Sequence, residues 1–268
     1  MSSNAALKNY YTLITGASSG IGWELAHEYA RNGHSLILTA RTTSKLNELK
    51  AELEKKHNAL IEVISLDLSK PTSAEKLFSE IKSRGFKLNG LVNNAGFGDH
   101  SEFAKSNFNK ISEMIQLNVN SLTEITHLFM SDLIKNAPSK IMNVASTAAF
   151  LPGPLMAVYY ATKAFVLSFS EGLSKELETQ NVSVTALCPG PTTSGFMEAA
   201  NFSNSSYLQK IKFPTSRAVA VYAYQKTMNN QVIAVHGVLN NIMVFATRIM
   251  PRSFTRGLVL SVQKKRQS

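Results

Sequence analysis

The sequence predicts an α/β fold in which one doubly wound parallel sheet carries helices on both faces. Short apolar, β-branched runs alternate with longer amphipathic runs along most of the chain. No turn signal of the β-hairpin type separates two of the apolar runs, so helical crossovers must join neighbouring strands. With 268 residues, of which 44% are hydrophobic, the chain can bury one large core. We therefore expect a single domain over residues 1–268.

Each expected element has the length and composition of a strand or of a helix. The strands are expected at residues 10–15, 35–40, 60–66, 89–93, 140–144 and 182–188. The helices are expected from about residue 20 to 32 and at 44–57, 72–84, 108–135 (one long or broken helix) and 157–180. Ser44 is expected to cap the second helix, and Gly85 to end the third.

A glycine-rich turn follows the first strand directly. It reads Gly16-Ala17-Ser18-Ser19-Gly20-Ile21-Gly22 and runs into a helix. Glycines let the backbone approach a pyrophosphate, and a helix N-terminus presents free N–H groups and a partial positive charge. The spacing differs from the G-x-G-x-x-G of the general dinucleotide fingerprint. The order of strand, turn and helix nevertheless favours a phosphate-binding turn of a Rossmann-like fold.

A tyrosine and a lysine stand one helical turn apart in the last expected helix. Tyr159 and Lys163 share a helix face, thirteen residues after Ser146. An ammonium group beside a phenol favours the phenolate, so we expect Lys163 to lower the pKa of Tyr159. Bringing a phenol from about 10 to neutrality needs roughly 3 pKa units, or about 4 kcal/mol. One close cation supplies part of that, and a positively charged cofactor ring would add to it. Taken alone, such a pair is common on helices.

Together these motifs resemble the short-chain dehydrogenase/reductase family. The resemblance covers residues from about 13 to 194 and is closest to hydroxysteroid- and ketoacyl-reductase-like members. The matching motifs are Thr15-Gly16-x-x-x-Gly20-x-Gly22, Asn93-Asn94-Ala95-Gly96, Asn118, Ser146, Tyr159-x-x-x-Lys163 and Pro189-Gly190.

The resemblance implies a catalytic role for four side chains. Tyr159 would protonate a carbonyl oxygen during reduction, or act as the base in alcohol oxidation. Ser146 would hydrogen-bond the same oxygen. Lys163 would depress the tyrosine's pKa and bind the nicotinamide ribose, and Asn118 would anchor a water that relays protons to Lys163. The neighbouring Tyr160 and Asn120 fit these spacings less well, so we expect packing or pocket lining from the tyrosine and a structural role for the asparagine.

The resemblance also implies a nicotinamide dinucleotide, and the residues favour NADP(H). Thr39-Ala40-Arg41-Thr42, at the end of the second strand, lacks the acid that would hold a free ribose hydroxyl. Arg41 suits a 2′-phosphate instead. Asp67 would contact the adenine edge or cap the following turn. The other expected cofactor contacts are Gly16, Ser18, Ser19, Gly20, Ile21 and Gly22 at the phosphates, Asn94 at the adenosine, Tyr159 and Lys163, and Pro189, Gly190, Thr192 and Ser194 near the carboxamide.

Two stretches within the domain are expected: a substrate-side lid over about residues 192–216 and a C-terminal extension over about 237–268. Apolar residues suggest a pocket wall at Phe150, Leu151, Pro152, Leu155, Met156, Phe196 and Met197. The apolar run at 238–254 is interrupted by asparagines, arginines and a proline. It favours a core or oligomer helix over a weak interfacial anchor.

Composition narrows the setting of the protein. The single cysteine, Cys188, excludes intrachain disulfides and is expected to be a buried apolar residue. The N-terminus has no apolar core of a signal peptide, and no run approaches the ~18 apolar residues of a membrane span. These features predict a cytoplasmic protein. The six histidines lack metal-ligand spacing, so no metal site is expected.

Partners follow from the charge and the resemblance. The net charge of +10 attracts phosphates and acidic lipids, whereas no nucleic-acid partner is expected. The helices at 108–135 and 157–180 would build a homodimer or homotetramer, as in the resembled family. A weak peripheral membrane contact through the C-terminal region stays open.

The leading functional hypothesis is an NADP-dependent oxidoreductase that transfers a hydride between nicotinamide and a carbonyl or secondary alcohol. An apolar ketone, a 3-oxoacyl thioester or a steroid-like compound would be its substrate, with small aldehydes as a further option. The alternative is a non-catalytic NADP(H)-binding sensor or interaction protein on the same fold.

Overall fold

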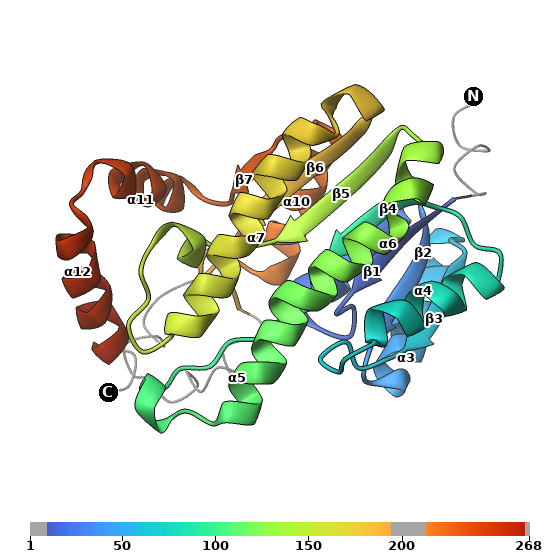
Figure 1. Ribbon diagram of the computed structural model, residues 1–268. Helices are drawn as coiled ribbons and strands as arrows, with labels where there is room; N and C mark the ends of the chain where they lie inside the picture. The colour runs from blue at the N-terminus through green and yellow to red at the C-terminus, as the bar shows by residue number, and fades with distance from the viewer. Residues whose placement is uncertain (1–9, 194–212, 266–268) are drawn as a thin grey trace.

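The computed structural model describes residues 10–193 and 213–265 of the chain (Figure 1). Among these residues, seven strands form one sheet in the order β3-β2-β1-β4-β5-β6-β7, and every neighbouring pair is parallel. The strands are β1 Tyr11–Thr15, β2 Ser35–Ala40, β3 Ile61–Ser65, β4 Leu88–Asn93, β5 Ser139–Val144, β6 Val182–Cys188 and β7 Ile233–Val235. The predicted doubly wound parallel sheet is therefore confirmed.

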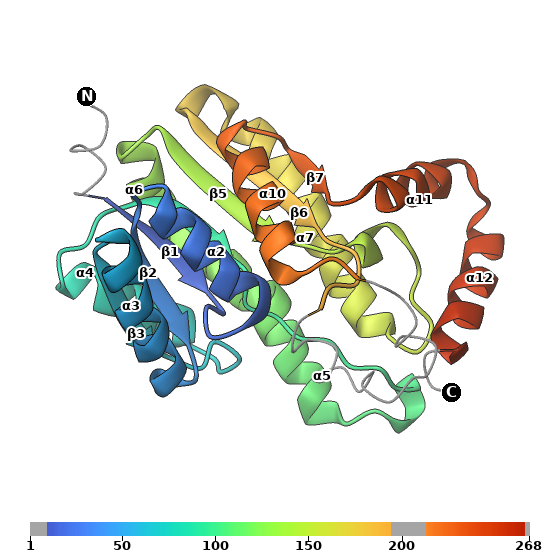
Figure 2. The same ribbon diagram turned by 180° about the vertical axis from the view of Figure 1, so that it is seen from behind.

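Helices cover both faces of the sheet. On one face lie α2 Gly20–Arg31, α3 Thr43–His57 and α10 Ser216–Met228 (Figure 2). On the other lie α4 Ser73–Ser83, α6 Leu122–Lys135 and α7 Ala157–Glu176 (Figure 1). Short 3-10 turns occur at Phe103–Lys105, Thr147–Phe150 and Glu178–Gln180.

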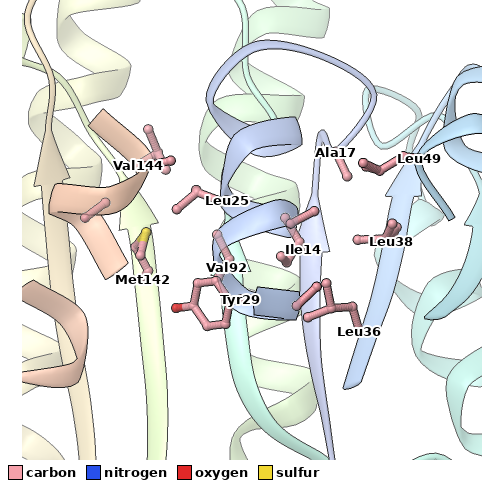
Figure 3. Close-up of a cluster of buried hydrophobic side chains, with 14 of the residues drawn as sticks. Ile14, Ala17, Leu25, Tyr29, Leu36, Leu38, Leu49, Val92, Met142 and Val144 are labelled. Carbon is pink, nitrogen blue, oxygen red and sulfur yellow. The ribbon is translucent and has the colours of Figure 1, made fainter. Parts of the chain in front are cut away.

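The core on the first face joins the central strands to the glycine-turn helix. Figure 3 shows Ile14 of β1 and Leu36 and Leu38 of β2 beside Leu25 and Tyr29 of α2. All five side chains are fully or almost fully buried. This packing fixes α2 against the sheet, and so fixes the direction in which its N-terminus points.

Residues 108–135, predicted as one long or broken helix, form a broken helix. It consists of α5 Phe108–Ile115, a π-helical turn at Gln116–Ser121 and then α6. Single π-turns inside helices occur often at functional sites. Here the turn contains Asn118, one of the expected catalytic residues.

Local predictions of caps were only partly correct. Gly85 follows the end of α4 with a positive φ of 72°, as a helix-ending glycine should. Ser44 is not an N-cap, because α3 already begins at Thr43 and Thr42 occupies the cap position without a side-chain hydrogen bond. The short strand β7 and helix α10 had no expected counterpart.

The C-terminal segment differs most from expectation. It forms two helices, α11 Val238–Ile249 and α12 Arg252–Lys265, which meet at Met250-Pro251 and extend beyond the edge of the sheet (Figure 1). Only Val244 of α11 is buried, so 238–254 is not a core helix, while its alternative role as an oligomer helix stays a prediction. None of the helices in residues 10–193 and 213–265 is long and apolar enough to cross a bilayer.

Candidate active site

A cavity of about 530 Å³ opens at the carboxyl ends of the strands. It lies where the strand order reverses, between β1 and β4, which is where open parallel sheets bind ligands. Among the expected site residues, the cavity is lined by Gly16, Ser18, Ser19, Gly20, Ile21, Arg41, Asp67, Asn94, Ser146, Tyr159, Lys163, Pro189, Gly190 and Thr192. Gly22 and Asn118 are not among its lining residues, and Ser194 lies outside the described residues.

The glycine turn has the backbone shape of a phosphate cradle. Gly16 and Gly20 have positive φ angles of 66° and 59°. A Cβ on Gly22 would lie 2.3 Å from the Gly16 carbonyl oxygen, so only glycine lets helix and turn approach this closely. Ser19, at the start of α2, makes no side-chain cap, and the first turn has no acidic residue. The first N–H groups of α2 are therefore available to an anion, and the turn fits a dinucleotide pyrophosphate.

Hydrogen bonds tie this turn to the end of β4. The Asn94 amide nitrogen donates to the carbonyl oxygens of Thr15 (2.9 Å) and Gly16 (3.0 Å). In return, the Thr15 hydroxyl accepts from the backbone N–H groups of Asn94 and Ala95, both at 3.0 Å. The side chain of Asn94 thus holds the cradle, while its position on the cavity wall agrees with the expected contact.

The end of the cavity beside β2 and β3 carries one cation and one anion. Arg41 is exposed beside the end of β2, and its guanidinium forms no ion pair within the described residues. Burial would raise the pKa of Asp67, but hydrogen bonds from Ser69 and the charges of Arg41 and Lys70 hold it below its usual value. Asp67 therefore caps the turn before α4, and it also lines the cavity, where its contact with an adenine edge stays a prediction.

Ser146, Tyr159 and Lys163 meet at the other end. Ser146 follows β5, and its hydroxyl accepts from the Ala148 N–H (3.1 Å) and bonds the side chain of Tyr159. Tyr159 and Lys163 are both buried on α7, with the Lys163 nitrogen 5.9 Å from the centre of the tyrosine ring. The same nitrogen donates to the Val144 carbonyl oxygen at 2.7 Å.

The expected pKa of the tyrosine is not what this geometry produces. Burial raises the pKa of Tyr159 above its usual value, the bond with Ser146 works in the opposite direction, and Tyr160 adds to the rise. Burial lowers the pKa of Lys163 to about 8. Lys163 is still mostly protonated at pH 7, but its ammonium donates to a backbone carbonyl rather than to the phenol oxygen. The lysine alone does not bring the phenol toward neutrality.

Asn118 lies next to this group without facing the cavity. Both hydrogens of its amide are used, one on the Phe97 carbonyl (2.9 Å) and one on the Thr162 hydroxyl (3.1 Å). Its amide oxygen accepts from the Phe97 N–H at 3.1 Å. The side chain therefore joins the Gly96 loop to α7. Because neither amide hydrogen is free, a water held by Asn118 would have to donate a hydrogen bond to one of that residue's oxygen atoms. Asn120 is exposed and bonds Gln116, in agreement with a structural role.

The loop after β6 lines the cavity close to Ser146. The Pro189 carbonyl accepts from the Thr147 N–H at 2.9 Å, which joins the ends of β5 and β6. Gly190 lies against Asn240, whose amide nitrogen would be 2.6 Å from a Cβ at that position. Cys188, just before this loop, is buried, and burial raises the pKa of its thiol to about 12, as a buried apolar residue requires.

The C-terminal helices supply a wall that sequence reasoning missed. Of the expected apolar wall, Leu151 and Met156 line the cavity, Phe150, Pro152 and Leu155 are not among the lining residues, and Phe196 and Met197 lie outside the described residues. Further lining comes from α11, α12 and the turn between them: Asn240, Met243, Thr247, Met250, Leu258, Val259, Val262 and Gln263. In α11 these residues recur at helical spacing, which is the signal that could have identified them.

One polar pair stands in this apolar wall. The Gln263 amide nitrogen donates to the Tyr160 hydroxyl at 2.8 Å, and the buried amide oxygen has no partner among the described residues. Whichever way the amide is turned, one of its two polar atoms stays free. Tyr160 is thus a pocket-lining residue, as the spacing argument suggested.

Comparison with known proteins identifies the family. The sequence model of the short chain dehydrogenase family matches residues 11–204, which is most of the chain. This protein belongs to that family. It is therefore an oxidoreductase that acts on alcohol and carbonyl groups with a nicotinamide cofactor.

Individual relatives show how far the likeness extends. A very-long-chain 3-oxoacyl-CoA reductase of Vanderwaltozyma polyspora is 34% identical over 65% of this chain, which spans only 53% of that relative's length. A protein of the same name from Mus musculus is 28% identical over 95% of this chain and 80% of its own. The structure of a short-chain dehydrogenase from Sphingobium yanoikuyae in complex with NADPH superposes with a TM-score of 0.79 at 27% identity, covering 89% of this chain and 93% of that one.

No cluster of three or more His, Cys, Asp or Glu side chains suited to a metal ion occurs in residues 10–193 and 213–265.

Gly96 offers a test of how tightly this site is built. A Cβ there would lie 2.9 Å from the Asn118 amide oxygen and 3.4 Å from the Lys163 nitrogen. We expect Gly96→Ala to displace both groups and to lower kcat/KM by about 10- to 100-fold, measured by nicotinamide absorbance. Gly172→Ala on α7 is the matched control, because no atom lies within 4 Å of its new Cβ. Equal activity in the two variants would show that the loop position is unimportant.

Proposed function

We propose that the protein is an NADP(H)-dependent reductase of ketones with substantial apolar surface, working in the reverse direction as a secondary-alcohol dehydrogenase. One observation carries this proposal: a single cavity joins a glycine cradle and Arg41 at one end to Ser146, Tyr159 and Lys163 at the other. A dinucleotide extended between these ends would bring its nicotinamide to the buried tyrosine.

In this proposal Tyr159 is the proton donor. The bound cofactor supplies the hydride. Tyr159 gives its phenolic proton to the carbonyl oxygen, and Ser146 donates a hydrogen bond to that oxygen. The raised pKa of Tyr159 keeps the phenol protonated at neutral pH, as reduction requires. Lys163, with a pKa near 8, can exchange a proton with solvent at physiological pH, and Asn118 holds the Gly96 loop beside it.

The substrate class follows from the wall of the cavity. Leu151, Met156 and the side chains of α11 and α12 make the substrate end apolar. This favours an apolar ketone, a 3-oxoacyl compound or a steroid-like ketone over a small polar aldehyde. The relatives include proteins named very-long-chain 3-oxoacyl-CoA reductase and 11-beta-hydroxysteroid dehydrogenase, which points the same way. The free amide atom of Gln263 would bond a polar group on such a substrate.

The proposed unit is one domain over residues 1–268, with a substrate-side lid over about 192–216, of which 194–212 lie outside the described residues, and a C-terminal extension over about 237–268. Within it, the helices α5, α6 and α7 form the proposed homodimer contact. Ile115 and Phe165 are exposed on α5 and α7, and Phe165 stacks on Phe169 at 5.9 Å, which gives this surface an apolar centre. Light scattering at micromolar concentration should show a dimer or tetramer; a monomer alone would refute the assembly.

The tyrosine assignment predicts the effect of removing one oxygen. Tyr159→Phe should abolish turnover, because the ring still packs but carries no proton, and should leave NADPH affinity almost unchanged. Substrate-dependent NADPH consumption and NADPH fluorescence measure the two quantities.

Tyr160→Phe is the matched control. It removes the hydroxyl that bonds Gln263 and should change KM more than kcat. Loss of turnover in Tyr160→Phe, with activity kept in Tyr159→Phe, would reverse the assignment. NADPH binding without turnover of any carbonyl compound, in a screen of graded size, would favour the alternative of a non-catalytic NADP(H) sensor.

Cofactor choice rests on Arg41. A charge-assisted contact with a 2′-phosphate contributes about 1.5–3 kcal/mol, or roughly a 10- to 150-fold preference for NADPH over NADH. Arg41→Gln should remove that preference, and Ala40→Asp/Arg41→Gln should reverse it, because the new carboxylate repels the phosphate and accepts from a free ribose hydroxyl.

Fluorescence titration of both reduced cofactors at two salt concentrations tests this proposal. The preference of the unmodified protein should shrink as salt rises, because Arg41 is exposed. Arg84→Gln is the control: this arginine lies beyond α4, pairs with Glu80 and does not line the cavity. Equal affinities for NADPH and NADH in the unmodified protein would leave Arg41 as an ordinary surface residue.

A further inference from the structure

Helix α11 carries an apolar stripe on its solvent side. Val238, Ile242, Phe245 and Ile249 follow one another at intervals of about one helical turn, and their exposed fractions are 77%, 60%, 64% and 72%. The adjacent Leu239 is 82% exposed. Scattered apolar side chains are normal on protein surfaces, but a continuous stripe of large ones marks a contact surface.

The exposed stripe is not the core-packing side of α11. The opposite side of α11 already has a partner, because Val244 is buried in a core cluster with Val235 and Met243 packs against that cluster. A helix that is apolar on two sides needs a partner on both. Within the described residues, nothing covers the outer one.

The next helix extends the same kind of surface. Phe254 of α12 is 60% exposed and does not line the cavity, and Leu258 is 48% exposed at the cavity rim, whereas Val259 and Gln263 are buried in the cavity wall. Both views of the ribbon show α11 and α12 together at the outer edge of the molecule, past β7 (Figures 1 and 2). We call these two helices, with their exposed apolar side chains, the C-terminal platform.

Charge identifies what this platform contacts. Residues 238–268 contain six Lys and Arg and no Asp or Glu, and the last acid of the chain is Glu198. Arg248, Arg252 and Arg256 form no ion pair among the described residues, whereas three of the four lysines of α3 pair with Glu48, Glu52 and Glu54. The platform therefore combines apolar side chains with uncompensated positive charge.

A second copy of this chain does not suit such a surface. Two platforms facing one another would bring like charges together, which costs free energy at an interface. An anionic bilayer surface meets both demands at once, since acyl chains receive the apolar side chains and acidic headgroups receive the arginines.

We propose that the C-terminal platform docks the protein on the surface of membranes that contain anionic lipids. The stripe of α11 enters the boundary between headgroups and acyl chains, and neither helix crosses the bilayer. Because the reverse side of the same helices forms the cavity wall, docking places the substrate end of the cavity next to the bilayer. The docking itself does not depend on the reaction proposed above.

Vesicle co-sedimentation of the full chain tests the proposal. The protein should pellet with phosphatidylcholine/phosphatidylglycerol vesicles and much less with pure phosphatidylcholine, and its binding to the mixed vesicles should weaken as salt rises. Phe245→Gln/Ile249→Gln should weaken binding to the mixed vesicles by at least about tenfold, since two inserted apolar side chains are lost. Arg248→Gln/Arg252→Gln/Arg256→Gln should remove the preference for the anionic lipid.

Leu60→Gln is the matched control. Leu60 is half-exposed immediately before β3, at the opposite edge of the sheet, so its replacement should leave vesicle binding unchanged. None of the substituted platform residues lines the cavity, so NADPH binding and thermal unfolding should match the unmodified protein and show that each variant is folded.

Three results would overturn the proposal. The first is failure of the unmodified protein to bind mixed vesicles. The second is equal loss of binding in Leu60→Gln and in Phe245→Gln/Ile249→Gln. The third is a change of oligomeric state in Phe245→Gln/Ile249→Gln by light scattering without any vesicle binding by the unmodified protein, which would make the platform a contact between copies.

Discussion

The site depends on one network of hydrogen bonds between the ends of β1 and β4. Thr15 and Asn94 exchange side-chain and backbone bonds there, so the glycine turn and the Gly96 loop cannot move independently. These two strands are the neighbours at which the sheet reverses its winding. The turn determines where a phosphate can bind, and the loop determines, through Asn118 and Thr162, where α7 presents Tyr159. The distance that a dinucleotide would have to span, from the glycine turn to Tyr159, thus depends on a contact in the middle of the sheet.

The buried lysine shows how electrostatics and packing compete in this cavity. Withdrawing an ammonium from water is unfavourable, and a backbone carbonyl compensates only in part, so burial lowers the pKa of Lys163 to about 8. The same withdrawal from water raises the pKa of Tyr159. Without other charges the pair therefore holds a neutral phenol, which is the state a proton donor needs. A phenolate, which alcohol oxidation would need as its base, requires additional positive charge near the ring.

Sequence reasoning succeeded where one local pattern implies one environment. The alternating runs predicted six of the strands within one or two residues, and the glycines at 16, 20 and 22 predicted a turn whose close approaches do exclude a side chain. It failed where the environment is set by distant parts of the chain. The pKa of Tyr159 depends on burial that no i, i+4 spacing reveals. The bonding of Asn118 depends on Phe97 and Thr162, and the three-residue strand β7 is held only by its pairing with β6.

The C-terminal segment shows a further limit of pattern reading. An apolar run with few polar interruptions is typical of a buried helix, because one enclosing core is the usual reason for apolar residues on all sides. Here two separate demands produce the same composition. The inner side of α11 completes the wall of a cavity, and its outer side exposes Ile242, Phe245 and Ile249. Hydropathy counts both sets equally, and only the direction of each side chain separates them. The arginines near the outer side chains distinguish the two cases that hydropathy does not, because a fully enclosed helix would not carry arginines without ion-pair partners.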